Sequence, residues 1–338
     1  MELANASLLD EGTAAAEAMT MLHAVKPREK KTANRFFVDE KVFPQTKALL
    51  ETRAEPIGIE LVFGSIDQLD VTDPELYGIL FQYPDADGAV RDYTAIVAAA
   101  KEHQVLTAFA SDLLALTILT PPGEMGADVV VGSAQRFGVP MGYGGPHAAF
   151  FATKEEYKRQ IPGRIIGVSI DKAGNKSYRM ALQTREQHIK REKATSNICT
   201  AQVLLAVMSS FYAVYHGPKG LKNIALRTHG LAKITAQALK QAGLKVGEQI
   251  FFDTIEVKMN EVSQERVKGL ALDKEMNFRY DKKSVFISFD ETKTLEDVKT
   301  IVNIFIAEEG KHSLNLDELV SNLSLELPES LLRKSDYL

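Results

Sequence analysis

Short apolar runs alternate with longer helix-forming stretches through residues 14–132, and this alternation limits the folds that the chain can adopt. We expect strands at Arg35–Val38, Glu60–Phe63, Gly78–Gln82, Val105–Ala110 and Asp128–Gly132, and helices at Ala14–Ala24, Pro44–Ile57 and Asp92–Glu102. Strands separated by helices need crossover connections, which are almost always right-handed and generate a mostly parallel sheet covered on both faces. The sequence therefore predicts a large α/β domain over residues 1–220.

The hydrophobic pattern changes after residue 153. Residues 154–193 are charged and carry little regular apolar period, so we expect loops there, with Lys154 and Lys158 on a solvated helix. An apolar helix is expected from Cys199 to His216. An amphipathic helix is expected from about Leu221 to Gly243, where it would link two domains.

The remaining pattern predicts a second, smaller domain. Its expected elements are strands at Ile255–Met259 and Ser284–Phe289 and helices at Ser263–Leu270 and Leu295–Ile306. These predict a small α+β domain at residues 221–310. Residues 311–338 are polar, and we expect them to form a C-terminal extension without its own core.

Composition excludes several classes of protein. The net charge of -5 leaves no basic surplus for a nucleic acid. The most apolar stretch, Val105–Leu119, is interrupted by Ser111 and Asp112, so we expect no membrane span. A single cysteine, Cys199, cannot form an internal disulfide framework, and no leader-like segment stands at the N-terminus, so we expect a cytoplasmic protein, or a mitochondrial-matrix one if the source is eukaryotic.

A glycine-rich segment follows the expected strand at 128–132. Residues 132–147 have the sequence Gly-Ser-Ala-Gln-Arg-Phe-Gly-Val-Pro-Met-Gly-Tyr-Gly-Gly-Pro-His. Gly142, Gly144 and Gly145 allow backbone conformations closed to other residues and let another chain or ligand approach closely. Their spacing is not that of a dinucleotide-binding fingerprint, and glycines alone are typical of a tight structural turn.

The chain resembles the glycine-cleavage P-protein family. The resemblance is carried by residues 132–153, by Leu182–Gln202 with its Gln-Thr-Arg-Glu-Gln-His-Ile-Lys-Arg-Glu-Lys-Ala-Thr-Ser-Asn core, by Asn5–Ala18 and by Gln82–Gly88. It extends over most of residues 1–310. That family is built from two homologous halves, fused or on two subunits. Both halves have the aspartate-aminotransferase-like fold of pyridoxal-phosphate (PLP) enzymes, which is fold type I.

The resemblance also implies which half this chain is. Only the C-terminal half of the family carries the Schiff-base lysine, in a His-Lys-Thr-Phe segment followed by a Gly-Gly-Gly-Gly-Pro loop. Aligning that loop with Gly142–Pro146 places Gln135 on the lysine position and Phe137 on its phenylalanine. A carboxamide cannot form an imine with the PLP aldehyde. We therefore expect the N-terminal half, with no catalytic residue of its own.

The start of the first helix resembles a phosphate-binding position. In related PLP folds, backbone N–H groups at the position of Gly12 and Thr13 hold the cofactor phosphate. Glu11 would repel a phosphate, so besides a phosphate-binding loop this segment can be a vestige of one or simply a helix N-terminus.

A second loop resembles one that crosses a dimer interface in related folds. Thr195, Ser196 and Asn197 would then contact the phosphate of PLP held by the partner half, and Gly144 and Gly145 would lie close to the same cofactor. The alternative for the first three residues is an N-cap of the helix that starts near Cys199.

Other polar residues give weaker predictions. Asp112 is either a partner of the cofactor's pyridine nitrogen, by analogy, or structural. His147 and His188 have no metal-site spacing, so we expect no metal. The basic cluster attracts an acidic partner or is a solvated face; its members are Arg185, Lys190, Arg191 and Lys193.

The resemblance implies a function for the complete enzyme. A complete P-protein is an oxidoreductase that decarboxylates glycine with PLP and passes the aminomethyl group to the lipoyl arm of the H-protein. The present half would join a lysine-bearing C-terminal half in a dimer-like assembly and would be inactive alone. Two alternatives remain at this point. One is a self-sufficient PLP aminotransferase or desulfurase-like homodimer, and the other is a non-catalytic scaffold that binds the lipoyl carrier.

Overall fold

The computed structural model describes residues 1–5, 7–195, 202–247, 249–308 and 316–338. The described part divides into two compact units. Unit 1 contains Met1–Tyr83, Tyr93–Leu113 and Pro121–Tyr215. Unit 2 contains Pro84–Asp92, Leu114–Thr120 and His216–Leu338, so the units are discontinuous along the chain, whereas the expected domains at 1–220, 221–310 and 311–338 are continuous.

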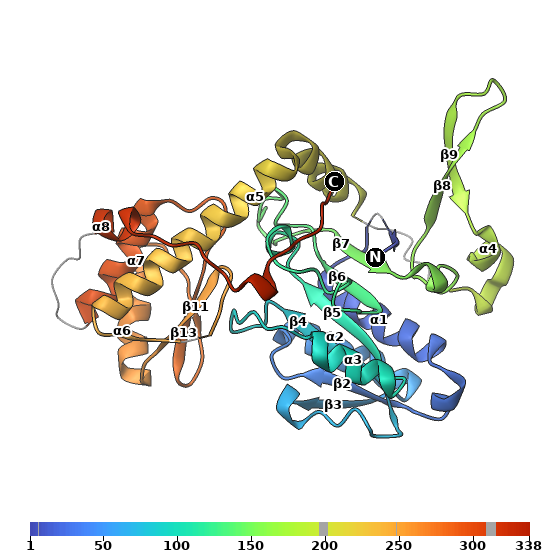
Figure 1. Cartoon of the computed structure of the whole chain (residues 1–338), viewed down its shortest axis with the longest axis horizontal. Coiled ribbons are helices and arrows are strands. Elements are labelled where there is room, and N and C mark those ends of the chain that lie inside the picture. The colour runs from blue at the N-terminus through green and yellow to red at the C-terminus, as the bar shows by residue number, and fades with distance from the viewer. Residues whose placement is uncertain (6, 196–201, 248, 309–315) are drawn as a thin grey trace. The chain divides into compact units, whose positions relative to one another are not determined.

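Unit 1 is built on a large sheet that has seven strands within the described residues. In order across the sheet they are β1 (Leu3–Ala4), β7 (Ala149–Thr153), β6 (Val129–Ser133), β5 (Leu106–Ser111), β4 (Leu76–Tyr83), β2 (Arg35–Asp39) and β3 (Glu60–Gly64). Strands β2 to β6 are parallel, and β1 and β7 are antiparallel to their neighbours (Figure 1). The prediction of a mostly parallel sheet is confirmed.

Helices α1 (Glu11–Val25), α2 (Pro44–Ala54) and α3 (Thr94–Glu102) accompany the large sheet. Ala14, Ala15, Ala16 and Ala18 of α1 are fully buried, because their small side chains let the helix lie close to the strands and to α2. Every residue of β4 is buried, as expected for a central strand of a parallel sheet covered on both faces.

Two expectations for unit 1 are wrong. Residues 154–193 are not mainly loop, because they contain an antiparallel hairpin of β8 (Ile165–Ile170) and β9 (Lys176–Ala181), which extends away from the large sheet in Figure 1. Lys154 and Lys158 do not lie on a solvated helix. Only one 3-10 turn stands there, at Glu155–Tyr157, and Lys154 Nζ lies 2.5 Å from Asp128 Oδ1.

Unit 2 combines a small antiparallel sheet with helices. Its strand order is β10 (Lys245–Val246), β11 (Thr254–Lys258), β13 (Ser284–Ser288) and β12 (Arg279–Tyr280). The accompanying helices are α6 (Glu261–Leu272), α7 (Leu295–Glu308) and α8 (Leu316–Ser321). This arrangement confirms the predicted small α+β fold.

Helix α5 (Val203–Gln241) contains a break close to the residue at which the chain passes from unit 1 to unit 2. Gly217 has φ 61° and ψ 179°, and Pro218 follows it, so α5 consists of one helical segment before Gly217 and another after it. Proline lacks the N–H group that would continue the hydrogen-bond ladder. No helix among the described residues has the length and apolar run that crossing a membrane requires.

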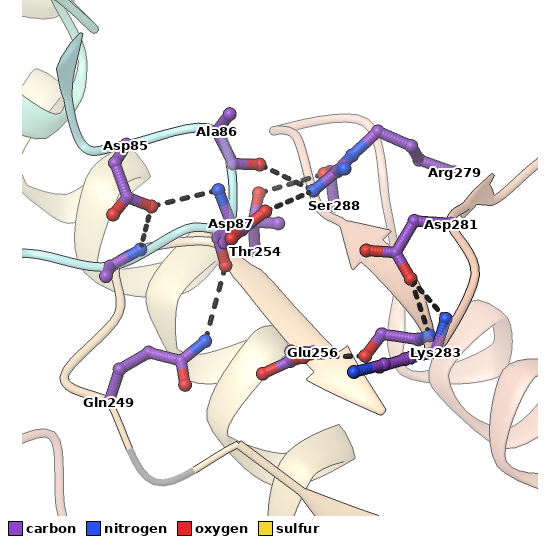
Figure 2. A network of polar contacts seen from close by, with 12 residues as sticks. Asp85, Ala86, Asp87, Gln249, Thr254, Glu256, Arg279, Asp281, Lys283 and Ser288 are labelled. Carbon is purple, nitrogen blue, oxygen red and sulfur yellow. Dashed lines mark hydrogen bonds and ion pairs between the residues drawn. The ribbon is translucent and has the colours of Figure 1, made fainter. Parts of the chain in front are cut away.

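The short segment 84–92 follows β4 along the chain but packs in unit 2. Arg279 Nη2 donates a hydrogen bond to Asp87 Oδ1 at 3.1 Å, and Asp85 Oδ1 accepts one from the backbone N–H of Asp87 at 2.9 Å (Figure 2). Gly88 has φ 87°, and a Cβ at this position would lie 2.3 Å from the carbonyl oxygen of Thr254. Only glycine permits this approach of two backbones.

The last residues of the chain pack in unit 2 against segment 114–120. The backbone N–H of Thr120 donates to the Leu331 carbonyl at 2.8 Å, and that of Arg333 donates to the Ile118 carbonyl at 2.9 Å. Leu331 is 3% exposed. The C-terminal segment is therefore tied to the unit by backbone pairing and apolar contact.

Candidate functional site

Polar side chains gather where the parallel strands of the large sheet end. Strands β4, β5 and β6 end at Tyr83, Ser111 and Ser133, and ligands of open α/β sheets bind at this carboxyl edge. At this edge Glu11 of α1 contacts Gln82 and Ser133 and lies within electrostatic range of Asp112. Sequence reasoning identified Glu11 and Asp112 but missed Gln82 and Ser133. Their position at the ends of parallel strands was the available signal.

The N-terminus of α1 is capped by the chain's own Asp10. The Asp10 Oδ1 atom accepts a hydrogen bond from the Thr13 backbone N–H at 2.7 Å, so this donor of the expected phosphate loop is already occupied. Gly12 is buried, and a Cβ there would lie 3.2 Å from Leu49 Cδ2, which shows that close packing against α2 also favours glycine at this position.

The carboxyl group of Glu11 is half-buried beside this cap. Its pKa is raised from 4.5 to about 7, chiefly by burial and also by the nearby charge of Asp112, while hydrogen bonds from the Gln82 side chain and the Ser133 backbone oppose the shift. Gln82 is 2% exposed, and its Oε1 atom has no hydrogen-bond partner among the described residues. A protonated Glu11 carboxyl would supply the donor that this amide oxygen lacks.

Asp112 forms an ion pair at the same edge. Arg136 Nη1 lies 3.3 Å from Asp112 Oδ2, and the two side chains are only 24% and 19% exposed. The backbone N–H of Asp112 donates to the Tyr83 carbonyl at 3.0 Å, which ties this aspartate to the end of β4. Arg136 was not identified from the sequence, because nothing in the chain order brings it near Asp112.

Gln135 follows β6 and its side chain lies near the glycine-rich turn. Its Nε2 atom is 3.6 Å from Met141 Sδ and would be 3.8 Å from a Cβ on Gly145. Gly145 has φ 61° and Tyr143 has φ 60°, so the turn uses the left-handed region that favours glycine. A Cβ on Gly144 would meet no described heavy atom within 4 Å. The turn is open at this glycine.

Of the expected interface loop, the structure describes only Thr195. Its backbone N–H donates to the Arg185 carbonyl at 3.2 Å, and its Oγ1 donates to the Arg159 carbonyl at 3.4 Å. Ser196 and Asn197 lie outside the described residues, as does Cys199.

The expected basic cluster is not a uniform solvated face. The Arg185 guanidinium is buried and donates to the carbonyls of Ile161 and Gly163, and burial lowers the pKa of Arg185. Lys190, Arg191 and Lys193 are exposed. Arg185 is therefore a structural residue, and the other three are surface charges.

The residues at the carboxyl edge do not fit PLP. The cofactor requires an amine for its aldehyde, a carboxylate free to face the pyridine nitrogen and an anion site for its phosphate. The chain presents the carboxamide of Gln135, an Asp112 paired with Arg136, and a helix N-terminus that carries Asp10 and Glu11. In the described part of the chain, no cluster of three or more His, Cys, Asp or Glu side chains is arranged to hold a metal ion.

The fold defines the chain's class. Its fold is that of the fold type I PLP enzymes. Serine palmitoyltransferase of Sphingomonas wittichii is 12% identical and superposes with a TM-score of 0.61 over 92% of this chain and 73% of that one. A cysteine desulfurase of Thermococcus onnurineus NA1 is 15% identical, with a TM-score of 0.59 over 90% of this chain and 79% of that one. These similarities show the fold alone, and the predicted fold class is confirmed.

Residues 1–305 match the model of the glycine cleavage system P-protein, and the chain belongs to this family. The glycine dehydrogenase (decarboxylating) of Flavobacterium johnsoniae is 57% identical over 100% of this chain and 35% of that protein. The mitochondrial one of Pisum sativum is 50% identical over 100% of this chain and 32% of that protein. A crystal structure of inhibitor-bound glycine decarboxylase (P-protein) is 30% identical, with a TM-score of 0.79 over 91% of this chain and 72% of that one. The chain spans about a third of the length of the curated relatives it matches.

Proposed function

We propose that the chain is the N-terminal part of a PLP-dependent glycine decarboxylase and that it completes an active site held by the lysine-bearing part of that enzyme. The observation that carries this proposal is the carboxamide of Gln135 at the glycine-rich turn, in a chain that belongs to the P-protein family. Without an amine at this position, this chain cannot hold the cofactor covalently there.

Exposed apolar side chains on α5 support a missing partner. The α5 stripe consists of Val203, Leu204, Val207, Phe211, Val214 and Tyr215, which lie one, three or four residues apart on the segment before Gly217. Phe211 is 68% exposed and Val214 is 80% exposed. A helix buries such a stripe against another element, and exposed apolar patches mark protein interfaces. About two thirds of the length of these relatives lies outside the residues present here, and we propose that this further part of the enzyme covers the α5 stripe.

The β8–β9 hairpin gives independent support. Ile166, Val168 and Ile170 lie on one face of β8, and Val168 pairs with Tyr178 of β9 on the same face. All four side chains are more than half exposed. A two-stranded hairpin is marginally stable alone in water, so an apolar face on it calls for a covering surface.

In the proposed complete enzyme, glycine is decarboxylated and its aminomethyl group passes to the lipoyl arm of the H-protein. PLP would be held by the lysine-bearing part and would supply the electron sink for decarboxylation. The residues of this chain would shape the site from outside the cofactor: Gly144 and Gly145 by allowing close approach, and Thr195 with Ser196 and Asn197 by offering hydrogen-bond donors to the phosphate.

Reconstitution tests the proposal. Glycine-dependent release of carbon dioxide is measured with this chain alone, with the lysine-bearing part alone, and with both, each in the presence of PLP. We expect release only from the mixture, together with a complex on size-exclusion chromatography. Carbon dioxide release by the chain alone, or a specific borohydride-trapped PLP adduct on one of its own lysines, would instead indicate a self-sufficient PLP homodimer. Copurification with the lipoyl carrier and not with the lysine-bearing part would indicate a scaffold.

A further inference from the structure

At the carboxyl edge of the large sheet, charged groups of the chain stand where the charged groups of a bound PLP would be expected. The cofactor carries an anionic phosphate, which helix N-termini bind, and a pyridine nitrogen, which a carboxylate faces. The N-terminus of α1 already has two carboxyl groups of the chain beside it: Asp10 Oδ1 accepts a hydrogen bond from the Thr13 backbone N–H at 2.7 Å, and the Glu11 carboxyl accepts one from the Ser133 backbone. Asp112 already has a cationic group against it, the guanidinium of Arg136, at 3.3 Å.

We propose that Glu11 and Arg136 fill this edge in place of the cofactor, so that the chain excludes PLP even as a non-covalent ligand. The Glu11 carboxyl takes the position of the phosphate, and the Arg136 guanidinium takes the position of the pyridine nitrogen. This goes beyond the proposed function, which concerns only the missing amine at Gln135. Introducing an amine at position 135 alone would therefore not allow PLP to bind at this edge.

Electrostatics supports this exclusion. The Glu11 carboxyl lies within range of two further carboxylates, Asp10 and Asp112, and only Asp112 has a cation paired with it in the described structure. A phosphate entering beside these groups would meet like charges at close range in a partly buried site, where repulsion is much stronger than in bulk water. The Thr13 N–H that could have compensated this repulsion is bonded to Asp10.

Burial and hydrogen bonding at this edge also support the exclusion of PLP. Gln82 is 2% exposed and directs its amide at Glu11, and a hydrogen bond from the Gln135 backbone N–H to Ser133 Oγ at 3.0 Å fixes the end of β6. The Asp112–Arg136 pair is mostly shielded from solvent. Breaking a shielded ion pair by inserting a ligand leaves one charge uncompensated unless the ligand replaces both partners.

Trapping experiments test the inference without relying on catalysis. Three variants are treated with PLP and borohydride, and the adduct is located by peptide mass spectrometry: Gln135→Lys alone, Gln135→Lys with Glu11→Ser and Arg136→Thr, and a matched control of Gln135→Lys with Glu155→Ser and Lys158→Thr. The control removes an exposed ion pair elsewhere in unit 1. We expect an adduct at position 135 only in the variant that carries the Glu11 and Arg136 changes.

A second measurement covers the case in which the triple variant does not fold. The double variant Glu11→Ser, Arg136→Thr keeps Gln135, and its binding of PLP is titrated by calorimetry against the wild-type chain. At pH 8, where the Glu11 carboxyl is mostly ionised, removing this like charge beside the phosphate should tighten binding at least about tenfold. Equal trapping by Gln135→Lys alone, or unchanged PLP affinity in a double variant with native circular dichroism, would overturn the inference.

Discussion

Replacing Glu11 with glutamine should stabilise the chain above neutral pH and have little effect in acid. Burial raises the pKa of Glu11 from 4.5 to about 7, so the folded state binds this proton more tightly than the unfolded state does. Stability that depends on this group is therefore intact below pH 4.5 and is lost as the pH rises through about 7. A shift of this size corresponds to about 3 kcal/mol of free energy of unfolding once the group is ionised in both states.

The assay is urea unfolding at several pH values between 4.5 and 8. The free energy of unfolding of Glu11→Gln should exceed that of the wild type by an amount that grows with pH toward about 3 kcal/mol. Because the chain contains two units, hydrogen exchange in peptides covering α1 provides a local readout that does not assume two-state unfolding. Glu29→Gln, which removes an exposed carboxyl of unit 1, is the matched control. Parallel pH profiles of Glu11→Gln and wild type would refute the reasoning.

Three further substitutions have definite expected outcomes. Gly132→Ala should cost more than about 3 kcal/mol and reduce soluble yield, because its Cβ would lie 2.1 Å from the Ser111 carbonyl oxygen; normal urea unfolding would contradict this. Lys154→Met should lower the free energy of unfolding by about 1–3 kcal/mol, because it leaves the buried Asp128 carboxylate without its cation; Lys158→Met is the exposed comparison. Phe211→Ser should change stability by less than about 0.5 kcal/mol but weaken binding to the lysine-bearing part about tenfold in a pull-down titration, and unchanged binding would remove the α5 stripe from the interface.

The central strands could be predicted from the sequence because burial on both faces leaves a continuous apolar run. Ile79, Leu80 and Phe81 of β4 are examples, each fully buried. The hairpin could not be predicted by the same rule. Ile166 and Val168 alternate with partly buried residues but face outward, and pattern reasoning assumes that the apolar face of a strand is covered within its own chain.

The candidate site was predictable only in part, for a different reason. Gln135 and Asp112 were identified because a family motif and a strand end mark them. The Arg136–Asp112 ion pair depends on which strands are neighbours, and the burial of Arg185 depends on carbonyl acceptors at Ile161 and Gly163 that have no sequence signal. The pattern therefore predicts a solvated face for the basic cluster, whereas Arg185 is buried in the structure.

Segments 84–92 and 114–120 belong to unit 2 but lie between parts of unit 1 in the sequence, so no single cut of the chain separates the two units. A fragment that begins at His216 would contain all the strands of the small sheet, yet it would lack the loop that packs on Thr254 and the backbone that pairs with Leu331 and Arg333. Limited proteolysis inside α5 should therefore release no independently stable C-terminal piece. These two segments follow β4 and β5 along the chain. Unfolding of unit 2 would therefore also disturb the ends of these strands, where Gln82 and Asp112 lie.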